Sequence, residues 1–205
     1  MKIGAEPSSR SKRDVILRVA AEEFGRNGFD ATMWARIAER AGIGNTALYH
    51  YFESKTHCLF TLLQDSNAAW YERWSACLVD SEKPVDAVLA AVRAAFDCTE
   101  ADTIKNRLLF YEQGKLITIE AKGRTEQAQT EALGDARRIE KLWIGYLTGA
   151  MESGAIPRQD PGVLAHAIIG LLQSVWGWYR PGGRRKLDYI KDRYCDYVRA
   201  MLAAA

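Results

Sequence analysis

The sequence predicts an all-α protein of about nine helices. Apolar residues recur at intervals of three and four along nearly the whole chain, and no run shows the alternation of a half-buried strand. Glycine and proline separate the periodic segments at spacings typical of helices. The chain has 205 residues, of which 48% are hydrophobic and 26% charged, so it can bury the core of one large domain or two small ones.

The N-terminal region predicts three helices that follow a polar start. Residues 1–11 are expected to form a disordered basic tail. Asn27-Gly28 ends the first helix by supplying a left-handed residue, and Thr32 is a favourable N-cap for the second. The second helix ends at Gly42, and the third is very short. The three are expected at about 12–26, 33–41 and 45–52.

The rest of the chain predicts six further helices. Ser54 caps the fourth, Pro84 suits the first helical position of the fifth, and Gly154 ends the seventh. The segment from Val163 to Trp178 is apolar nearly all round but shorter than the ~20 residues of a membrane-spanning helix, so we expect it to be buried. The fourth, sixth, seventh and eighth helices are expected at about 55–79, 102–119, 125–153 and 163–178. The fifth helix is expected to start at 84 and the ninth at about 187.

Composition and cysteine spacing narrow the classes of function. The formal net charge of +2 neither demands nor excludes a polyanionic partner. The first residues lack an apolar signal segment, so we expect a cytoplasmic protein without a membrane anchor. The four cysteines are widely spaced and form no C-x-x-C pair, which favours free thiols in a reducing compartment. We expect no metal site and no cofactor.

The segment GIGNTALYHYFESK, residues 42–55, carries the functional signal. Two helices joined by a tight glycine-containing turn form a helix-turn-helix. In this interpretation Ile43 fills the corner, while Leu48 and Phe52 face inward. The opposite side of the third helix then presents small polar and aromatic groups, which suits entry into the major groove of DNA. These groups are Asn45, Thr46, Tyr49 and His50.

Groups near this segment predict contacts with phosphate. Tyr49 and His50 can donate hydrogen bonds to phosphate oxygens. Lys55 lies at a helix start, where a cation and free backbone N–H groups together can hold an anion. A basic arm precedes the first helix: Arg10, Lys12 and Arg13. Each group also has an ordinary interpretation, as a half-buried aromatic, a solvated histidine or a solubilising tail.

The segment from about Lys12 to Phe60 resembles the DNA-binding domain of TetR/AcrR-family transcriptional regulators. The resemblance rests on Phe24, Gly28, Ala31-Thr32, Ile37-Ala38, Ala41-Gly42, Leu48-Tyr49-His50-Tyr51-Phe52 and Ser54-Lys55. It implies a DNA-binding domain over 12–60, with the helix-turn-helix at about 33–52, and a ligand-binding and dimerisation domain over 61–205. The residues expected at the DNA are Thr32, Arg36, Gly44, Asn45, Thr46, Ala47, Tyr49, His50 and Lys55.

The chain departs from the family pattern at several positions. Gly44 replaces a frequent serine, so the third helix lacks its usual side-chain cap. Ala35 stands where a polar contact residue is frequent, so base preference does not transfer. His57 stands where a glutamate would complete a capping box with Ser54. By position, Asn45, Thr46 and Ala47 match base-facing residues, and Thr32, Tyr49, His50 and Lys55 match phosphate-contacting ones.

The resemblance also implies a ligand pocket and a dimer interface formed by the last two helices. The alternative is that both helices belong to the core of a monomer. The expected interface residues are Leu164, Ile168, Leu171, Trp178, Tyr194, Tyr197, Val198 and Met201. The expected pocket residues are Phe110, Tyr111, Trp143, Tyr146, Gln173 and Trp176, each also a candidate for plain core. The string WGWYRPGG, 176–183, resembles a helix end in a branch of the family that responds to acyl-CoA and steroid-CoA esters.

These expectations describe a homodimeric repressor, released from a palindromic DNA operator by a small-molecule effector of acyl-CoA type or another hydrophobic ligand. The alternatives are a regulator with a non-repressing or ligand-independent role, a non-specific architectural DNA binder and an all-α enzyme. The modest net charge argues against non-specific binding, which depends on many phosphate contacts. The sequence holds no H-E-x-x-H motif and no phosphate-binding glycine loop, so we expect no enzyme.

Overall fold

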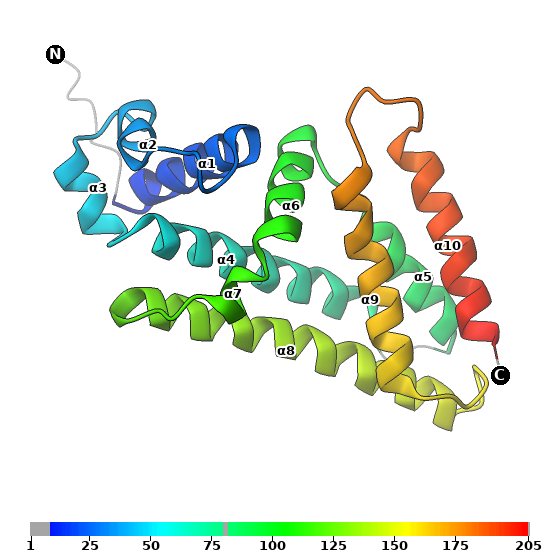
Figure 1. Cartoon of the computed structure of the whole chain (residues 1–205). Helices are drawn as coiled ribbons and strands as arrows, with labels where there is room; N and C mark the ends of the chain where they lie inside the picture. The colour runs from blue at the N-terminus through cyan, green and yellow to red at the C-terminus, as the bar shows by residue number, and fades with distance from the viewer. Residues whose placement is uncertain (1–8, 80–81, 205) are drawn as a thin grey trace, which may run out of the picture.

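The computed structural model describes residues 9–79 and 82–204, which form ten helices and no strand (Figure 1). This is one helix more than the nine that were predicted, and the additional one is the single-turn helix α7. The helices are α1 (Ser9–Asn27), α2 (Trp34–Arg40), α3 (Asn45–Tyr51), α4 (Lys55–Cys77), α5 (Pro84–Ala94), α6 (Glu100–Glu112), α7 (Lys115–Thr118), α8 (Gly123–Glu152), α9 (Pro161–Trp178) and α10 (Leu187–Ala203).

The first helix begins earlier than predicted. Residues 9–11 belong to α1, so the expected boundary of the tail at residue 11 was wrong. The rest of the expected tail, 1–8, lies outside the described residues. The helix ends as predicted before Gly28, whose φ of 84° lies in the left-handed region that favours glycine.

Thr32 does not cap α2, contrary to the prediction. Met33 holds the N-cap position and makes no side-chain cap hydrogen bond. The Thr32 hydroxyl instead donates to the carbonyl oxygens of Gly28 at 2.7 Å and Glu23 at 3.2 Å. The side chain therefore bonds to carbonyl oxygens at and just after the C-terminal end of α1 instead of capping α2.

The expected helix over 102–119 is divided in two. Its first part, α6, starts early because Thr99 and Asp102 form a capping box. It ends at Glu112, and α7 follows Gly114, whose low helix propensity favours a break. The other boundaries agree with prediction within a few residues. Ser54 caps α4 by accepting a hydrogen bond from the backbone N–H of His57.

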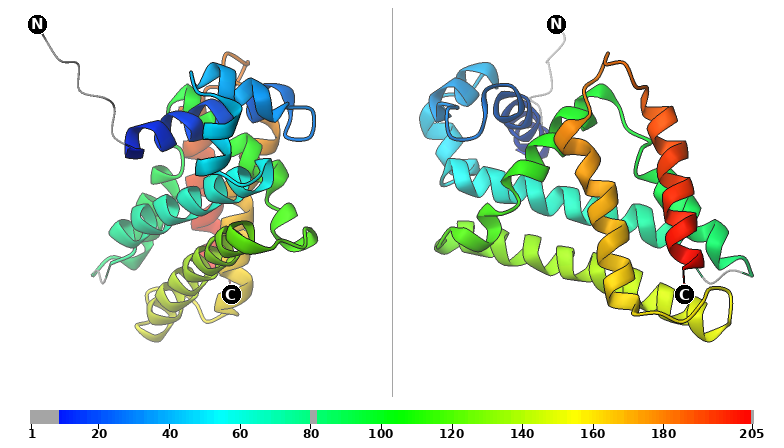
Figure 2. Two further views of the ribbon diagram at one scale, coloured as in Figure 1. Left: turned by 90° about the vertical axis from the view of Figure 1, so that its left-hand side faces the viewer. Right: turned by 45° about the vertical axis from the view of Figure 1, so that its right-hand side comes forward.

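The longest helices, α4 and α8, run side by side in the same direction through the molecule (Figures 1 and 2). The short helices α1–α3 sit at the N-terminal end of α4. At the other end, α5, α9 and α10 complete the bundle. Between these groups, α6 packs against both α1 and α9. Within the described part of the chain, no helix combines the length and apolar character needed to cross a membrane.

Two apolar clusters form the core, and α4 contributes to both. The N-terminal cluster joins α1–α3 with residues of α4 as far as Leu63 and with parts of α6, α7 and α8. The C-terminal cluster begins on α4 at Trp74 and joins α5, α8, α9 and α10. As predicted, the N-terminal helices pack against α4. Because Leu108 and Ala132 also belong to their core, the domain boundary at residue 60 stays a prediction.

Candidate functional site

One side of α3 is open to solvent and the other is core, as the spacing predicted. Leu48 is fully buried and Phe52 is 1% exposed. The opposite side presents exposed side chains at Asn45, Thr46, Tyr49 and His50, while Ala47 is half-buried. The short helix is therefore anchored through two apolar residues and leaves its polar and aromatic groups free for a partner.

The turn before α3 has the predicted geometry. Gly42 has a φ of 66°, which a side chain would disfavour. The next residue, Ile43, is half-buried against the N-terminal cluster and fills the corner between α2 and α3. Gly44 is the N-cap of α3 and provides no side-chain hydrogen bond, as expected.

Two residues predicted to contact phosphate are engaged inside the protein. The Lys55 ammonium donates to the carbonyl oxygens of Phe29, Thr32 and Asp30 at 2.8, 3.0 and 3.1 Å. It also lies 4.6 Å from the centroid of the Phe29 ring. Thr32 is only 4% exposed, and its hydroxyl donates to the Glu23 carbonyl oxygen of α1. Their contact with DNA stays a prediction, and the structure gives both a role in fixing the loop between α1 and α2.

Arg36, also predicted at the DNA, belongs to a buried charge cluster that joins α1 and α2. The carboxylate of Glu23 is almost wholly buried and receives Arg36 Nε at 2.9 Å and Arg40 Nη1 at 2.6 Å. Asn27 adds a third hydrogen bond at 2.9 Å. A buried carboxylate needs such partners, so this cluster sets the orientation of α2. The outer part of Arg36 remains exposed.

His57 completes the start of α4 in an unexpected way. Its Nδ1 accepts a hydrogen bond from the backbone N–H of Glu53 at 3.2 Å, while the backbone N–H of His57 donates to the Ser54 hydroxyl oxygen at 2.9 Å. The imidazole therefore accepts a backbone hydrogen bond at the start of α4, as the side chain of the absent glutamate would do in a capping box. Burial, assisted by the positive charge of Arg124, lowers the pKa of His57, so the neutral ring that can accept this bond is favoured.

A polar clasp joins the start of α8 to the end of α3. It consists of Glu53, Ser54, Arg124 and Thr125. Glu53 Oε1 accepts from both the backbone N–H and the hydroxyl of Thr125. Arg124 donates to the carbonyl oxygens of His50 and Tyr49 at 3.3 and 3.4 Å. Helix α8 therefore contacts Tyr49 and His50, the two residues that were predicted to bind phosphate at the end of α3.

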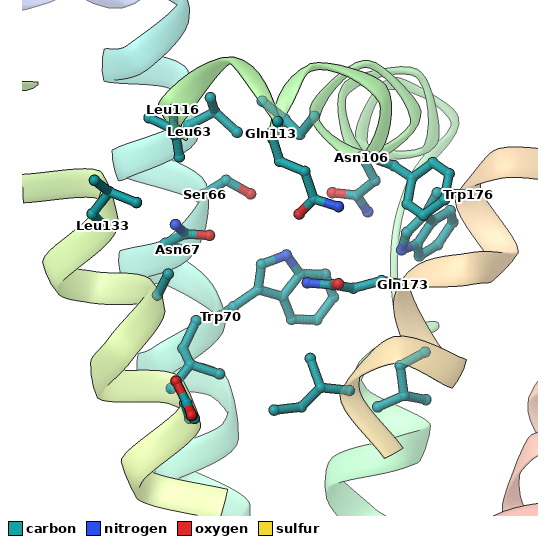
Figure 3. Close-up of a pocket in the computed structure, with 18 of the residues that line it drawn as sticks. Leu63, Ser66, Asn67, Trp70, Asn106, Gln113, Leu116, Leu133, Gln173 and Trp176 are labelled. Carbon is teal, nitrogen blue, oxygen red and sulfur yellow. The ribbon is translucent and has the colours of Figure 1, made fainter. Parts of the chain in front are cut away.

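A cavity of about 350 Å³ lies between the two apolar clusters (Figure 3). On α4 it spans the gap between the clusters, from Leu63 through Trp70 to Trp74. Side chains of α6, α8 and α9 complete the walls, together with the α6–α7 turn. The size falls within the range of small-molecule pockets, and the lining is mostly apolar and aromatic.

Amide and hydroxyl groups project into this cavity among the apolar walls. Figure 3 shows Ser66, Asn106, Gln113 and Gln173 directed toward its interior from separate segments. The fifth polar group, Asn67, donates to the carbonyl oxygen of Ala132 at 3.0 Å, which leaves its own oxygen free of that bond. The cavity therefore offers donors and acceptors on several sides.

The cavity includes some of the residues predicted for it and not others. Phe110, Gln173 and Trp176 line it. Tyr111 is exposed, and its hydroxyl donates to the carbonyl oxygen of Gly177. Trp143 is fully buried in the C-terminal cluster, where its indole N–H has no hydrogen-bond partner among the described residues. Tyr146 packs at the edge of that cluster. The pattern placed these residues on the right helices but could not fix the rotation of α8.

The helices α9 and α10 present an exposed apolar surface, but only part of it was predicted. Trp178 and Tyr197 are 45% and 54% exposed, and Leu171 and Met201 are half-buried. Val163 and Tyr189, which were not predicted, are exposed as well. The other predicted interface residues lie inside the protomer, within the C-terminal cluster: Leu164, Ile168, Tyr194 and Val198.

The described residues hold no group of His, Cys, Asp or Glu side chains suited to a metal ion. All four cysteines are free thiols. Burial raises the pKa of each thiol, most strongly at Cys58, so none is an activated nucleophile.

The sequence reasoning missed the clasp and most of the polar cavity lining. Arg124 lies 74 residues from His50, and only the parallel course of α4 and α8 brings them together. Asn106, in the middle of α6, and Gln113, at its C-cap, are of residue types that usually face solvent. An uncharged polar residue on the inner side of an amphipathic helix was the available signal, and it is a weak one.

Two family models match the chain. One, for bacterial regulatory proteins of the tetR family, covers residues 16–62. The other, for the tetracyclin repressor-like C-terminal domain, covers 103–202. The HTH-type transcriptional repressor KstR2 of Rhodococcus jostii (strain RHA1) is 28% identical over 200 residues, which span 94% of this chain and 92% of the relative.

Solved structures share the fold. AibR, solved in complex with isovaleryl coenzyme A and operator DNA, superposes with a TM-score of 0.76 at 20% identity, covering 91% of this chain and 97% of that one. The ketosteroid transcriptional regulator KstR2 of Mycobacterium tuberculosis gives a TM-score of 0.74 at 23% identity over the full length of both chains.

Proposed function

Because the chain belongs to the TetR family of bacterial regulatory proteins, we propose that it is a homodimeric repressor that leaves a palindromic operator when an effector binds its cavity. The observation that carries the proposal is the exposed side of α3, held rigidly on a buried core. A repressor of this kind acts on DNA in the cytoplasm, and the proposal assigns no catalysis to the chain.

In this proposal α3 enters the major groove. Asn45, Thr46 and Ala47 at its N-terminal end face the base edges. Tyr49 and His50 bond to phosphate oxygens and fix the position of the helix along the duplex. Arg124 holds the backbone of both residues in place, because it donates hydrogen bonds to their carbonyl oxygens.

The exposed parts of α9 and α10 form the interface with a second protomer. Trp178 and Tyr197 are large aromatic groups that a lone protomer leaves in water. A twofold axis at this surface would place the two copies of α3 on one face of a duplex. Their half-sites would then be spaced by about one helical turn, ~34–36 Å, or a multiple of it.

The effector occupies the cavity between the two clusters. The structural neighbour AibR was solved with isovaleryl coenzyme A and operator DNA. A common fold and a cavity with apolar walls support an acyl-CoA thioester as the effector class here. The cavity touches α4, α6 and α8, which all reach the N-terminal cluster, so filling it can shift the angle at which α3 is held.

The route through α8 is short and continuous. Glu140 lies at the cavity and Thr125 in the clasp, about 22 Å apart at 1.5 Å per helical residue. An effector that binds the released form of the dimer better than the DNA-bound form would lower operator affinity. By linkage, operator DNA must weaken effector binding by the same factor.

The test is selection of binding sites from a random duplex library with the purified protein. We expect an enriched palindrome whose affinity falls at least tenfold for His50→Ala and clearly for Tyr49→Phe. Tyr111→Phe is the matched control, because Tyr111 is 58% exposed against 54% for Tyr49 but lies on α6, away from both α3 and the proposed interface. If the effector-stripped, refolded protein enriches no sequence, the assignment is refuted.

A further inference from the structure

The start of α8 brings a guanidinium group from the C-terminal half of the chain to the end of α3. Figure 1 shows the start of α8 and α3 at the same end of the molecule. Arg124 Nη1 donates to the carbonyl oxygen of His50 at 3.3 Å, and its Nη2 donates to that of Tyr49 at 3.4 Å. In the proposed function these two residues bond to phosphate, so Arg124 lies beside the path proposed for the DNA backbone.

The hydrogen bonds within the protein do not use the whole capacity of this guanidinium group. A guanidinium carries five N–H donors, and the two carbonyl oxygens take two of them. Its Nε lies 3.7 Å from Oε2 of Glu53, which is longer than the ~2.7–2.9 Å of a charge-assisted hydrogen bond. Because 48% of the side chain is exposed, Arg124 can still donate to a group that approaches from solvent.

A second cation, Lys122, lies two residues before Arg124 and is exposed. Its ammonium makes no hydrogen bond or ion pair with any part of the chain that the structure describes. Glu126 follows Arg124 by two residues, which places it about 200° round the helix, on the other side. Among the described residues, neither Glu126 nor Glu120 forms an ion pair with the two cations. Both positive charges are therefore available to an anionic partner.

The backbone N–H groups at the start of α8 are not the anion site themselves. Oε1 of Glu53 accepts the backbone N–H of Thr125 at 2.7 Å, so a carboxylate of the protein already occupies this helix end. A phosphate beside α3 would meet the two side-chain cations instead. Arginine suits such a contact, because its planar fork of donors matches the oxygens of phosphate, and lysine adds a point charge.

We propose that Arg124 and Lys122 bind the phosphate backbone of the operator, so that the region matched by the C-terminal family model takes part in the DNA interface. The proposal rests on the proposed function, in which α3 enters the major groove. The same helix, α8, lines the cavity through Ile139 and Glu140. A shift of α8 on effector binding would therefore withdraw two cations per protomer from the DNA directly, in addition to any change in the angle of α3.

The salt dependence of DNA binding tests the proposal, because each phosphate contact made by a cation releases counterions. The logarithm of the binding constant falls with the logarithm of salt concentration by ~0.9 per contact on duplex DNA. We expect Lys122→Gln and Arg124→Gln each to reduce the size of this slope by about 1.8, since the dimer carries two copies. Fluorescence anisotropy between about 50 and 200 mM salt measures the slope. Lys122→Gln should weaken binding to the selected palindrome and to a scrambled duplex by the same factor, because phosphate contacts carry no sequence information.

The same helix provides matched controls. Arg137→Gln and Lys141→Gln change exposed cations that lie at least about 20 Å farther along α8 at 1.5 Å per residue, so their slopes should equal that of the wild type. Arg124→Lys separates charge from geometry, because it keeps the charge and alters the hydrogen bonds to α3. Its slope should also match the wild type, even where its affinity is lower.

The outcomes separate this proposal from the function on which it rests. If Lys122→Gln or Arg124→Gln has the same slope as its control, on a duplex that the wild type binds, the inference is overturned and the regulator assignment stands. Lower affinity of Arg124→Gln with an unchanged slope would show that Arg124 acts only by holding α3. If the wild-type protein binds no selected duplex, the regulator assignment itself is rejected, and this inference with it.

Discussion

Glu53 and Thr125, 72 residues apart in the sequence, are joined by two hydrogen bonds to a single oxygen. Glu53 Oε1 receives the Thr125 backbone N–H at 2.7 Å and its hydroxyl at 2.6 Å. The bond from the Thr125 hydroxyl is the largest cause that lowers the pKa of Glu53, followed by the bond from the Thr125 backbone N–H. One carboxylate therefore links the turn after α3 to the first turn of α8.

Glu53→Ala should loosen the turn after α3 without unfolding the protein. The change removes both hydrogen bonds to Thr125 and the 3.7 Å ion pair with Arg124. We expect faster amide hydrogen exchange over residues 49–55, measured by mass spectrometry. Gln64→Ala is the control, because it breaks a 2.7 Å contact with Glu131 farther along the same pair of helices. Equal acceleration in the control would mean that the clasp has no special role.

Glu23→Gln should cost about 3 kcal/mol of unfolding free energy, because it leaves Arg36 and Arg40 without their buried partner. Urea unfolding measures the change. Glu22→Gln is the control, since Glu22 is more exposed and its ion pairs should contribute less than about 1 kcal/mol. A loss at Glu23 no larger than at Glu22 would show that the charge cluster does not hold α2 in place.

The protein should lose stability below about pH 6.5 through His57. Its pKa is lowered in the folded state, mainly by burial, so the unfolded chain binds the proton more readily. The contribution of the neutral ring is complete above the unfolded pKa and declines as pH falls from there toward the lower folded pKa. Glutamine can accept the same hydrogen bond without titrating, so His57→Gln should flatten this part of the pH profile of unfolding free energy. An unchanged profile would contradict the prediction.

Gly25→Ala should separate α1 from α6. A Cβ atom at Gly25 would lie 2.5 Å from Cγ2 of Ile104, so either the Ile104 side chain or one of the two helices must shift. We expect a loss of about 1–3 kcal/mol in unfolding free energy. Gly145→Ala, where nothing lies within 4 Å of the added Cβ, should instead stabilise the protein by up to about 1 kcal/mol. Adding Ile104→Ala to Gly25→Ala should recover part of the loss, and failure to do so would place the strain elsewhere.

Local signals in the sequence were enough for most helices and for the exposed side of α3. Apolar spacing placed Leu48 and Phe52 inside, and Ser54 and Gly154 marked helix ends correctly. These features depend only on neighbours along the chain. Thr32 misled the prediction, because a hydroxyl that favours an N-cap can equally satisfy the carbonyl oxygens of the preceding helix.

The cavity was harder to predict because its shape depends on how helices are rotated against one another. Phe110, Gln173 and Trp176 were identified, whereas Trp143 turned out to be core, and Trp70 on α4 holds a central place instead. Both are tryptophans on amphipathic helices, and their local sequence does not distinguish them. The clasp depends in the same way on the relative position of α4 and α8.

The cavity is lined by the part of α4 that lies between the two apolar clusters, from Leu63 to Trp74. This position affects how a protein of the proposed kind could acquire a new effector. In the proposed regulator, substitutions on the outer faces of α3 or α10 would alter operator or partner preference one at a time. A substitution at Ser66, Asn67 or Trp70 alters the seam between two hydrophobic cores as well as the ligand. Redesign of specificity is therefore better begun on α6 and α9, where Asn106 and Gln173 face the cavity without joining the cores together.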